Sequence, residues 1–92
     1  MEMVIVYLPS ILRKITNEKK INVDASNLKE VIVELINRFG DPLKQKLFEE
    51  SGELNRYLKF YRKGVLLDEV NEMSTPLGET DEINILVIIG GG

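Results

Sequence analysis

Apolar and polar positions follow two different periods along this chain. Residues 3–8 form an unbroken apolar run, rich in β-branched side chains, that ends at Pro9, which cannot continue a central strand. Residues 20–24 alternate between apolar and polar positions, as a half-buried strand does. We therefore expect two strands joined as a hairpin, with the first strand covered on both faces.

Between residues 28 and 39 the period changes to that of an amphipathic α-helix. The apolar positions that share one helical face are Leu28, Val31, Ile32, Leu35, Ile36 and Phe39. Ser26 or Asn27 can accept a hydrogen bond from an unpaired amide at the helix start, and Asn27 with Glu30 fits a loose capping box. Gly40 is expected to end the helix.

A short helix and three more strands are predicted in the second half of the chain. Asp41 fits an N-cap followed by Pro42 in the first helical turn, and this helix is expected to continue to about Glu50. The predicted strands are residues 57–62, 65–67 and 83–88, with a turn at Lys63-Gly64. This order predicts an α+β fold in which one long helix crosses a mixed four- to five-stranded sheet and a short second helix follows it.

The composition restricts the chemistry that the side chains can perform. The 92 residues suit a single domain, and they include no cysteine and no histidine. This excludes thiolate nucleophiles, imidazole acid–base catalysis, and cysteine or histidine metal sites. The carboxylate pairs Glu49-Glu50 and Asp81-Glu82 lack a third ligand, so we expect no metal site and a protein that is not an enzyme.

Charge and hydropathy narrow the range of partners. The net charge of −3 argues against non-specific nucleic-acid binding, which needs a basic face. The apolar runs are far shorter than the ~18 residues of a membrane-spanning helix, and the first residues do not resemble a secretory leader. We expect a cytoplasmic protein with neither a nucleic-acid nor a membrane partner.

The final residues, Gly90-Gly91-Gly92, follow directly after an apolar run. Because glycine has no Cβ, such a tail can pass through a narrow channel into the active site of another protein. A frayed chain end is the alternative. We expect residues 1–88 to form the domain and residues 89–92 to form a flexible tail.

Four internal segments, placed in this order before the terminal glycines, carry a resemblance to a known family. They are residues 8–13, 27–32, 52–57 and 76–83. In this arrangement the chain resembles, over essentially its whole length, the β-grasp sulfur-carrier proteins. These include the small subunit of molybdopterin synthase and the sulfur carriers of thiamine and cysteine synthesis.

The resemblance implies a ubiquitin-like β-grasp fold and a carrier whose chemistry is at the C-terminus. A partner related to ubiquitin-activating enzymes would use ATP to adenylate the Gly92 carboxylate, and a sulfur donor would then displace AMP to leave a thiocarboxylate. Gly91 would keep the approach free of side chains. The second partner would be a sulfur-accepting enzyme, such as the large subunit of molybdopterin synthase, and the carrier itself would bind no cofactor.

Such a tail requires a docking surface on the body of the protein. Positions 83, 85 and 87 share one face of the last predicted strand. If these positions are core, Leu86 and Ile88 are left exposed beside the tail, where apolar patches often mark partner sites. The candidate partner-binding residues are Tyr57, Lys59, Tyr61, Arg62, Leu86, Ile88 and Ile89. The alternative is that the short helix or another part of the domain covers both faces.

The sequence leaves the pathway and the chemistry of transfer open. Molybdopterin synthesis is the first expectation for the sulfur and cysteine synthesis is the second. A ubiquitin-like modifier, joined through Gly92 to lysines of other proteins, is an alternative function. A β-grasp interaction domain that acts non-covalently is another.

Overall fold

The computed structural model describes residues 3–67 and 73–88. Its elements are β1 (Met3–Tyr7), α1 (Ser10–Thr16), β2 (Lys20–Asp24), α2 (Leu28–Phe39), α3 (Asp41–Leu47), β3 (Leu58–Arg62), β4 (Val65–Leu67) and β5 (Glu82–Val87). The expected tail, and with it Ile89, Gly91 and Gly92, lies outside the described residues.

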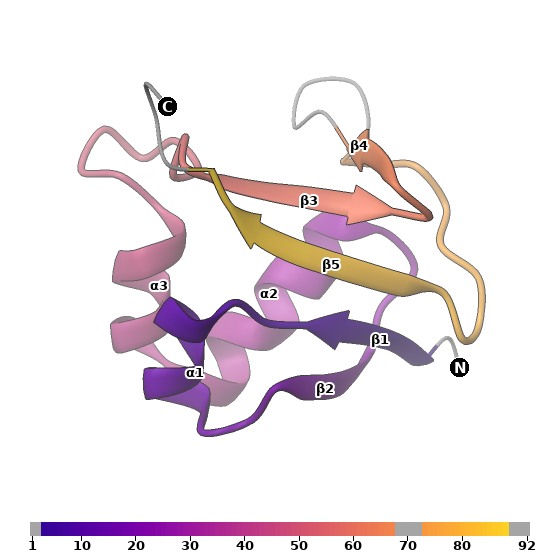
Figure 1. Cartoon of the computed structure of the whole chain (residues 1–92), viewed down its shortest axis with the longest axis horizontal. Coiled ribbons are helices and arrows are strands. Elements are labelled where there is room, and N and C mark those ends of the chain that lie inside the picture. Colours follow the sequence, from indigo (N-terminus) through magenta and orange to yellow (C-terminus); the bar gives the residue numbers. More distant parts are fainter. Residues whose placement is uncertain (1–2, 68–72, 89–92) are drawn as a thin grey trace.

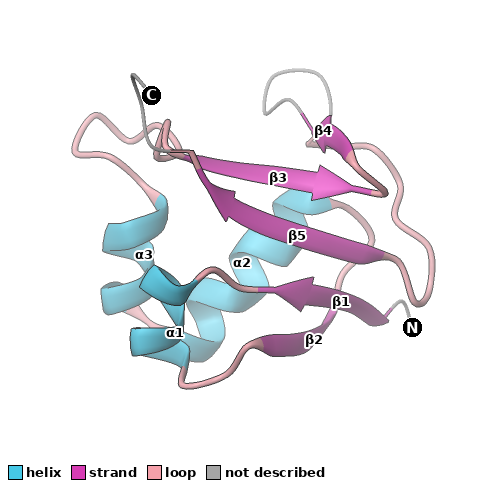
Figure 2. Ribbon diagram, in the orientation of Figure 1, coloured by secondary structure: helices cyan, strands magenta, loops and turns pink. Residues whose placement is uncertain are grey.

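The described strands form one five-stranded mixed sheet in the order β2-β1-β5-β3-β4. β1 and β5 run parallel at the centre, and the other neighbouring pairs are antiparallel. α2 crosses the sheet, while α1 and α3 lie side by side near the end toward which β1 and β5 point (Figure 1). The strands thus form one layer and α2 covers it from behind (Figure 2).

One face of the sheet and one face of α2 form the core. The largest buried side chains of the sheet alternate along each strand, as in Val4 and Val6 of β1 and Ile83 and Ile85 of β5. From α2 the buried residues are Leu28, Val31, Ile32 and Leu35. The buried residues of the strands, which alternate, and those of α2, which form one helical stripe, therefore pack into a single core.

The predicted long helix and its cap are confirmed. Asn27 Oδ1 accepts a hydrogen bond from Glu30 N at 2.9 Å, and Gly40, at φ 75°, ends the helix. Glu30 Oε1 accepts in turn from Ser26 N at 2.8 Å, so the carboxylate satisfies the amide one residue before the cap. The turn at Lys63-Gly64 is also confirmed, with φ values of 53° and 79°.

The prediction that a simple hairpin joins the first two strands is wrong. β1 and β2 do pair antiparallel, but α1 lies between them. Leu12 and Thr16 are its buried residues, one turn apart, and Asn17 ends it with φ 60°. The sequence did not predict α1 because two buried positions within seven residues do not establish a helical period.

Two further expectations are corrected by the structure. Gly40, not Asp41, is the N-cap of α3, and this helix ends at Leu47 instead of near Glu50. β1 is not covered on both faces, because Met3, Ile5 and Tyr7 are only half-buried while the alternate residues are buried. The described helices therefore leave the outer face of the sheet open.

Candidate docking surface and tail root

The open face of the sheet carries a group of side chains that we call the outer patch. It comprises Tyr57, Lys59, Tyr61, Leu66, Leu86 and Ile88. The register places Lys59 opposite Leu86, and Tyr61 between Asn84 and Leu66. Cross-strand partners point to the same face, so the side chains of three strands meet on this surface.

The outer patch is accessible and largely apolar. The exposed fractions are 46% for Tyr57, 44% for Leu66, 46% for Leu86 and 42% for Ile88. Lys59 and Tyr61 are half-buried between these neighbours. Exposed apolar patches rimmed by polar residues often mark interaction sites, so this surface is a candidate for docking.

The predicted exposure of Leu86 and Ile88 is confirmed, and the alternative that both faces are covered is wrong. α3 packs against α1 and α2 on the other side of the sheet. Val87 departs from the prediction, because it is 38% exposed although it shares a face with the buried Ile83 and Ile85. It is the last residue of β5, beyond the part of the sheet that α2 covers.

The outer patch lies next to the point at which the tail leaves the body, which we call the tail root. At the tail root, Ile88 N donates a hydrogen bond to Tyr57 O at 2.6 Å. Beyond Ile88 the chain has four residues, which can extend at most about 13–14 Å.

The candidate cations have different roles. Arg62 forms an ion pair of 2.9 Å with Asp81, and the two side chains are 28% and 9% exposed. Lys59 lies on the outer patch and forms no ion pair within the described part of the chain. Of these two candidate partner-binding residues, Arg62 is therefore committed to the domain, whereas Lys59 lies on the outer patch.

Asp81 is held by a second contact. Its Oδ2 accepts a hydrogen bond from Gly78 N at 2.7 Å. This backbone hydrogen bond, and then Arg62, lower the pKa of Asp81 below its ordinary value of 3.8, although burial opposes the change. Asp81 is therefore a charged structural residue at the entry to β5.

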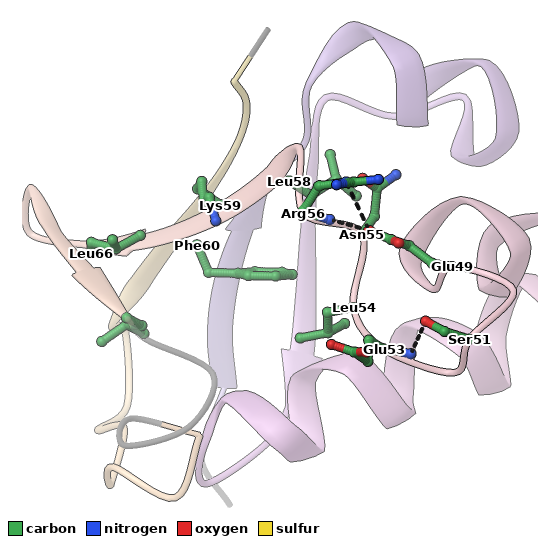
Figure 3. Close-up of a pocket in the computed structure, with 11 residues that line it drawn as sticks. Glu49, Ser51, Glu53, Leu54, Asn55, Arg56, Leu58, Lys59, Phe60 and Leu66 are labelled. Atoms are coloured by element: carbon green, nitrogen blue, oxygen red, sulfur yellow. Dashed lines mark hydrogen bonds and ion pairs between the residues drawn. The ribbon is translucent and has the colours of Figure 1, made fainter. Parts of the chain in front are cut away.

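A hollow of about 540 Å³ lies beside the tail root, between β3, β4 and the loop that follows α3 (Figure 3). Its walls combine apolar Leu54 and Phe60 with charged side chains, among them Glu49 and Arg56. Glu49 Oε2 accepts from Arg56 N at 2.9 Å and lies 3.7 Å from Arg56 Nε. Glu49 and Arg56 are therefore paired with each other on one wall of the hollow.

The described residues contain neither a metal-binding cluster nor a membrane-spanning helix. Residues 3–67 and 73–88 contain no group of three or more acidic side chains that could hold a metal ion. Within the same ranges, no helix is long and apolar enough to cross a bilayer.

Sequence analysis missed two residues at this site. Leu66 was predicted to lie in a strand, but the three residues of β4 do not reveal which face is open. Asn55 was part of a segment that resembles the carriers, but its role was not identified. Asn55 connects α3 to the start of β3 through four hydrogen bonds. The sequence feature that could have indicated this role is an Asn just before a strand, because its short side chain can bond to nearby backbone groups.

Comparison with known proteins identifies the fold. No protein-family model and no curated protein match the chain. The small archaeal modifier protein 1 (SAMP1) of Methanosarcina acetivorans is similar, with 24% identity, a TM-score of 0.82 and coverage of 100% of this chain and 98% of that one. A chain of the BexX/CysO complex of Amycolatopsis orientalis matches with 24% identity, a TM-score of 0.77 and coverages of 97% and 99%.

A third match is the putative molybdopterin converting factor subunit 1 of Pyrococcus furiosus, with 12% identity and a TM-score of 0.74. It covers 97% of this chain and 100% of that one. At these identities the likeness concerns the fold, and it extends over the whole length of each chain. The resemblance to the sulfur carriers is confirmed at that level: the chain has the ubiquitin-like β-grasp fold of SAMP1, CysO and molybdopterin-converting-factor proteins.

Proposed function

We propose that the protein is a sulfur carrier that bears its cargo on the C-terminal carboxylate of Gly92. The observation that carries the proposal is the position of the exposed outer patch, directly beside the strand end from which the glycine tail continues. A partner docked on this patch is within reach of the tail. The same fold in CysO and in a molybdopterin converting factor subunit supports this assignment.

The proposed chemistry begins with activation of a poor electrophile. An α-carboxyl group has a pKa of roughly 3.3–3.7, so near neutral pH it is ionised and resists nucleophilic attack. In the activating partner, a carboxylate oxygen of Gly92 attacks the α-phosphorus of ATP and pyrophosphate leaves. A sulfur donor at the oxidation level of hydrosulfide then attacks the carbonyl carbon, and AMP leaves to give the thiocarboxylate.

In this scheme the protein contributes recognition and positioning, while the partners provide the catalytic groups and the ATP. The outer patch holds the body, and Gly91 and Gly92 place the carboxylate against the nucleotide. The activating partner is an adenylating enzyme of the ubiquitin-activating kind. The acceptor is an enzyme such as the large subunit of molybdopterin synthase or, as the second choice, an enzyme of cysteine synthesis. Because adenylation needs ATP, the proposal places the carrier in the cytoplasm.

Intact-mass analysis of the protein from its native host tests the proposal. A fraction of the molecules is expected to be heavier by one oxygen-to-sulfur exchange, and fragmentation should place the change at Gly92. Growth that demands sulfur transfer should increase this fraction. Its complete absence under those conditions would contradict the proposal.

Conjugation to other proteins is the second candidate, and one observation favours it. The structure of SAMP1, which is named a modifier protein, matches this chain over its full length. In this case Gly92 would form an isopeptide bond with lysines of other proteins. Adducts of higher mass that disappear when Gly91 and Gly92 are deleted would support conjugation, whereas full function of the truncated protein would favour a non-covalent role.

A further inference from the structure

We propose that Asn55 is a positioning residue that fixes the tail root and so determines where the glycine tail leaves the body. The inference deepens the proposed function and rests on it. It is carried by hydrogen bonds that run from the end of α3, through Asn55 and Tyr57, to Ile88.

The first half of this connection joins Asn55 to α3. Asn55 N donates to Leu47 O at 2.7 Å, and Asn55 Nδ2 donates to Lys46 O at 3.1 Å. Carbonyl groups in the last turn of a helix have no partner within the helix. Asn55 thus satisfies two of these carbonyls and is anchored to α3 through both its main chain and its side chain.

The second half joins Asn55 to the beginning of β3. Asn55 Oδ1 accepts a hydrogen bond from Tyr57 N at 2.9 Å, and Asn55 O accepts from Leu58 N at 3.0 Å. A side-chain oxygen that bonds to the amide two residues later forms a local turn. This turn sets the orientation of the peptide group of Tyr57.

Tyr57 O then accepts from Ile88 N at 2.6 Å, the hydrogen bond that defines the tail root. Tyr57 lies just before β3, and its hydrogen bond with Ile88 continues the antiparallel register in which Leu58 pairs with Val87. Tyr57 and Ile88 therefore end this ladder within the described residues, and the Asn55 turn borders the pair directly. A shift at Asn55 would reach Ile88 through only one intervening residue, Tyr57.

A second contact reinforces the same segment. Arg56 N donates to Glu49 Oε2 at 2.9 Å, and the guanidinium of Arg56 lies over the ring of Tyr57 at 5.5 Å. Figure 3 shows Asn55 and Arg56 on the loop beside Glu49. The Asn55 side chain holds the backbone amide of Tyr57, and the Glu49 carboxylate holds that of Arg56, the residue before it. Glu49 therefore supports the geometry that Asn55 establishes.

Asparagine matches the geometry because it provides both a donor and an acceptor on a short side chain. Asn55→Ala removes the bonds to Lys46 O and Tyr57 N. Asn55→Asp retains an acceptor for Tyr57 N but places an oxygen against Lys46 O. Comparing the two variants therefore separates the connection from Asn55 to the start of β3 from its connection to α3.

Amide hydrogen exchange measured by NMR is the first test. In Asn55→Ala, exchange of the Ile88 amide should accelerate by roughly tenfold or more, because local opening at the tail root becomes easier. Amides of β1 and β2, which lie toward the other edge of the sheet from β3, should keep their exchange rates. Asn55→Asp should give an intermediate rate for Ile88, and Asn37→Ala, on the exposed side of α2, should change none of these rates.

Adenylation by the activating enzyme is the second test. Asn55→Ala replaces no side chain of the outer patch, so KM for the carrier should stay within about twofold, while kcat should fall several-fold because fewer bound tails are aligned. If Asn55 only stabilised the fold, its substitution would not lower kcat while leaving KM unchanged. Asn55→Asp should recover part of kcat.

The two tests distinguish failure of this inference from failure of the proposed function. An unchanged Ile88 exchange rate in Asn55→Ala, or an equal acceleration in β1 and β2, would overturn the role of Asn55. A wild-type protein that is not adenylated would overturn the proposed function, while the exchange rates would still show whether Asn55 fixes the tail root. If Asn55→Ala does not fold, the rates of Asn55→Asp decide the question.

Discussion

At the scale of single residues, a few polar side chains join segments that are distant in the sequence. Asp81 connects the turn before β5 to β3 through Gly78 and Arg62. Asn55 connects α3 to β3. Leaving such partly buried groups without partners would cost more than the net gain of one hydrogen bond, so each position tolerates few alternatives.

Asp81 should make stability depend on pH in the acid range. A folded-state pKa below the ordinary 3.8 contributes stability that is fully present above that value and is lost as the pH falls through the folded pKa. Asp81→Asn should therefore lower the free energy of unfolding by about 1–3 kcal/mol at neutral pH. Below pH 3.8 the difference from the wild type should shrink.

Urea denaturation at a series of pH values measures this difference. Asp24→Asn is a matched control, because Asp24 is exposed at the end of an edge strand. Equal stability of Asp81→Asn and the wild type at neutral pH would show that the ion pair with Arg62 contributes no net stability, as can happen when desolvation offsets attraction.

At the scale of elements, α2 and β5 have separate tasks. α2 buries one face of the sheet and is stabilised locally by the bonds among Ser26, Asn27 and Glu30. β5 contributes Ile83 and Ile85 to the core and Leu86 to the outer patch. The same strand therefore links the packing of the domain to the surface that we propose for docking.

The cap of α2 should contribute measurable stability. Asn27→Ala removes the acceptor for Glu30 N, and we expect the free energy of unfolding to fall by about 0.5–2 kcal/mol. Thermal or urea unfolding measures this change. Asn37→Ala, within the helix and exposed, should have a smaller effect, and equal effects of the two substitutions would show that the cap is not the cause.

Leu86 should affect binding more than folding. Leu86→Glu places a charge in the outer patch, and we expect KM for adenylation to rise by roughly tenfold or more, whereas stability should change by only about 0.5 kcal/mol. Val33→Glu is the control, because Val33 is similarly exposed (47% against 46%) but lies on α2. Similar KM values for both variants would argue against docking through the outer patch.

At the scale of the whole molecule, the proposal separates a folded body from a reactive end. The described residues form a complete sheet with its core, and β5 is hydrogen-bonded on both sides, to β1 and to β3. The proposed reaction occurs beyond this body, at Gly92. Stability and carrier activity should consequently respond to different changes.

Deletion of Gly91 and Gly92 tests this separation. The melting temperature should remain within about 2 °C of the wild type, because the sheet and core formed by the described residues are left intact by this change. Adenylation should be abolished. An added alanine after Gly92 should have the same effect, because it displaces the carboxylate and adds a side chain to the tail, and substantial adenylation of either variant would contradict a role for Gly92.

Local patterns in the sequence predicted elements that are long or strongly periodic. The stripe from Leu28 to Phe39 predicted α2 with its observed bounds, because twelve residues sample three helical turns. α1 was missed because its seven residues bury only Leu12 and Thr16. The end of α3 was placed too late because Phe48 pairs with Leu54 in an isolated bridge, a contact between positions that no local pattern connects.

The sequence by itself determined the alternation along β5, the α2 stripe, the lack of cysteine and histidine, and the glycines that make Gly92 a candidate reactive end. Only the tertiary structure decided which face of β5 is open, that Leu66 joins Leu86 there, and that Asn55 connects α3 to the tail root. The physical reason is the range of the interactions. Periodicity and composition are local properties of the chain, whereas exposure and cross-strand hydrogen bonds depend on segments that folding brings together.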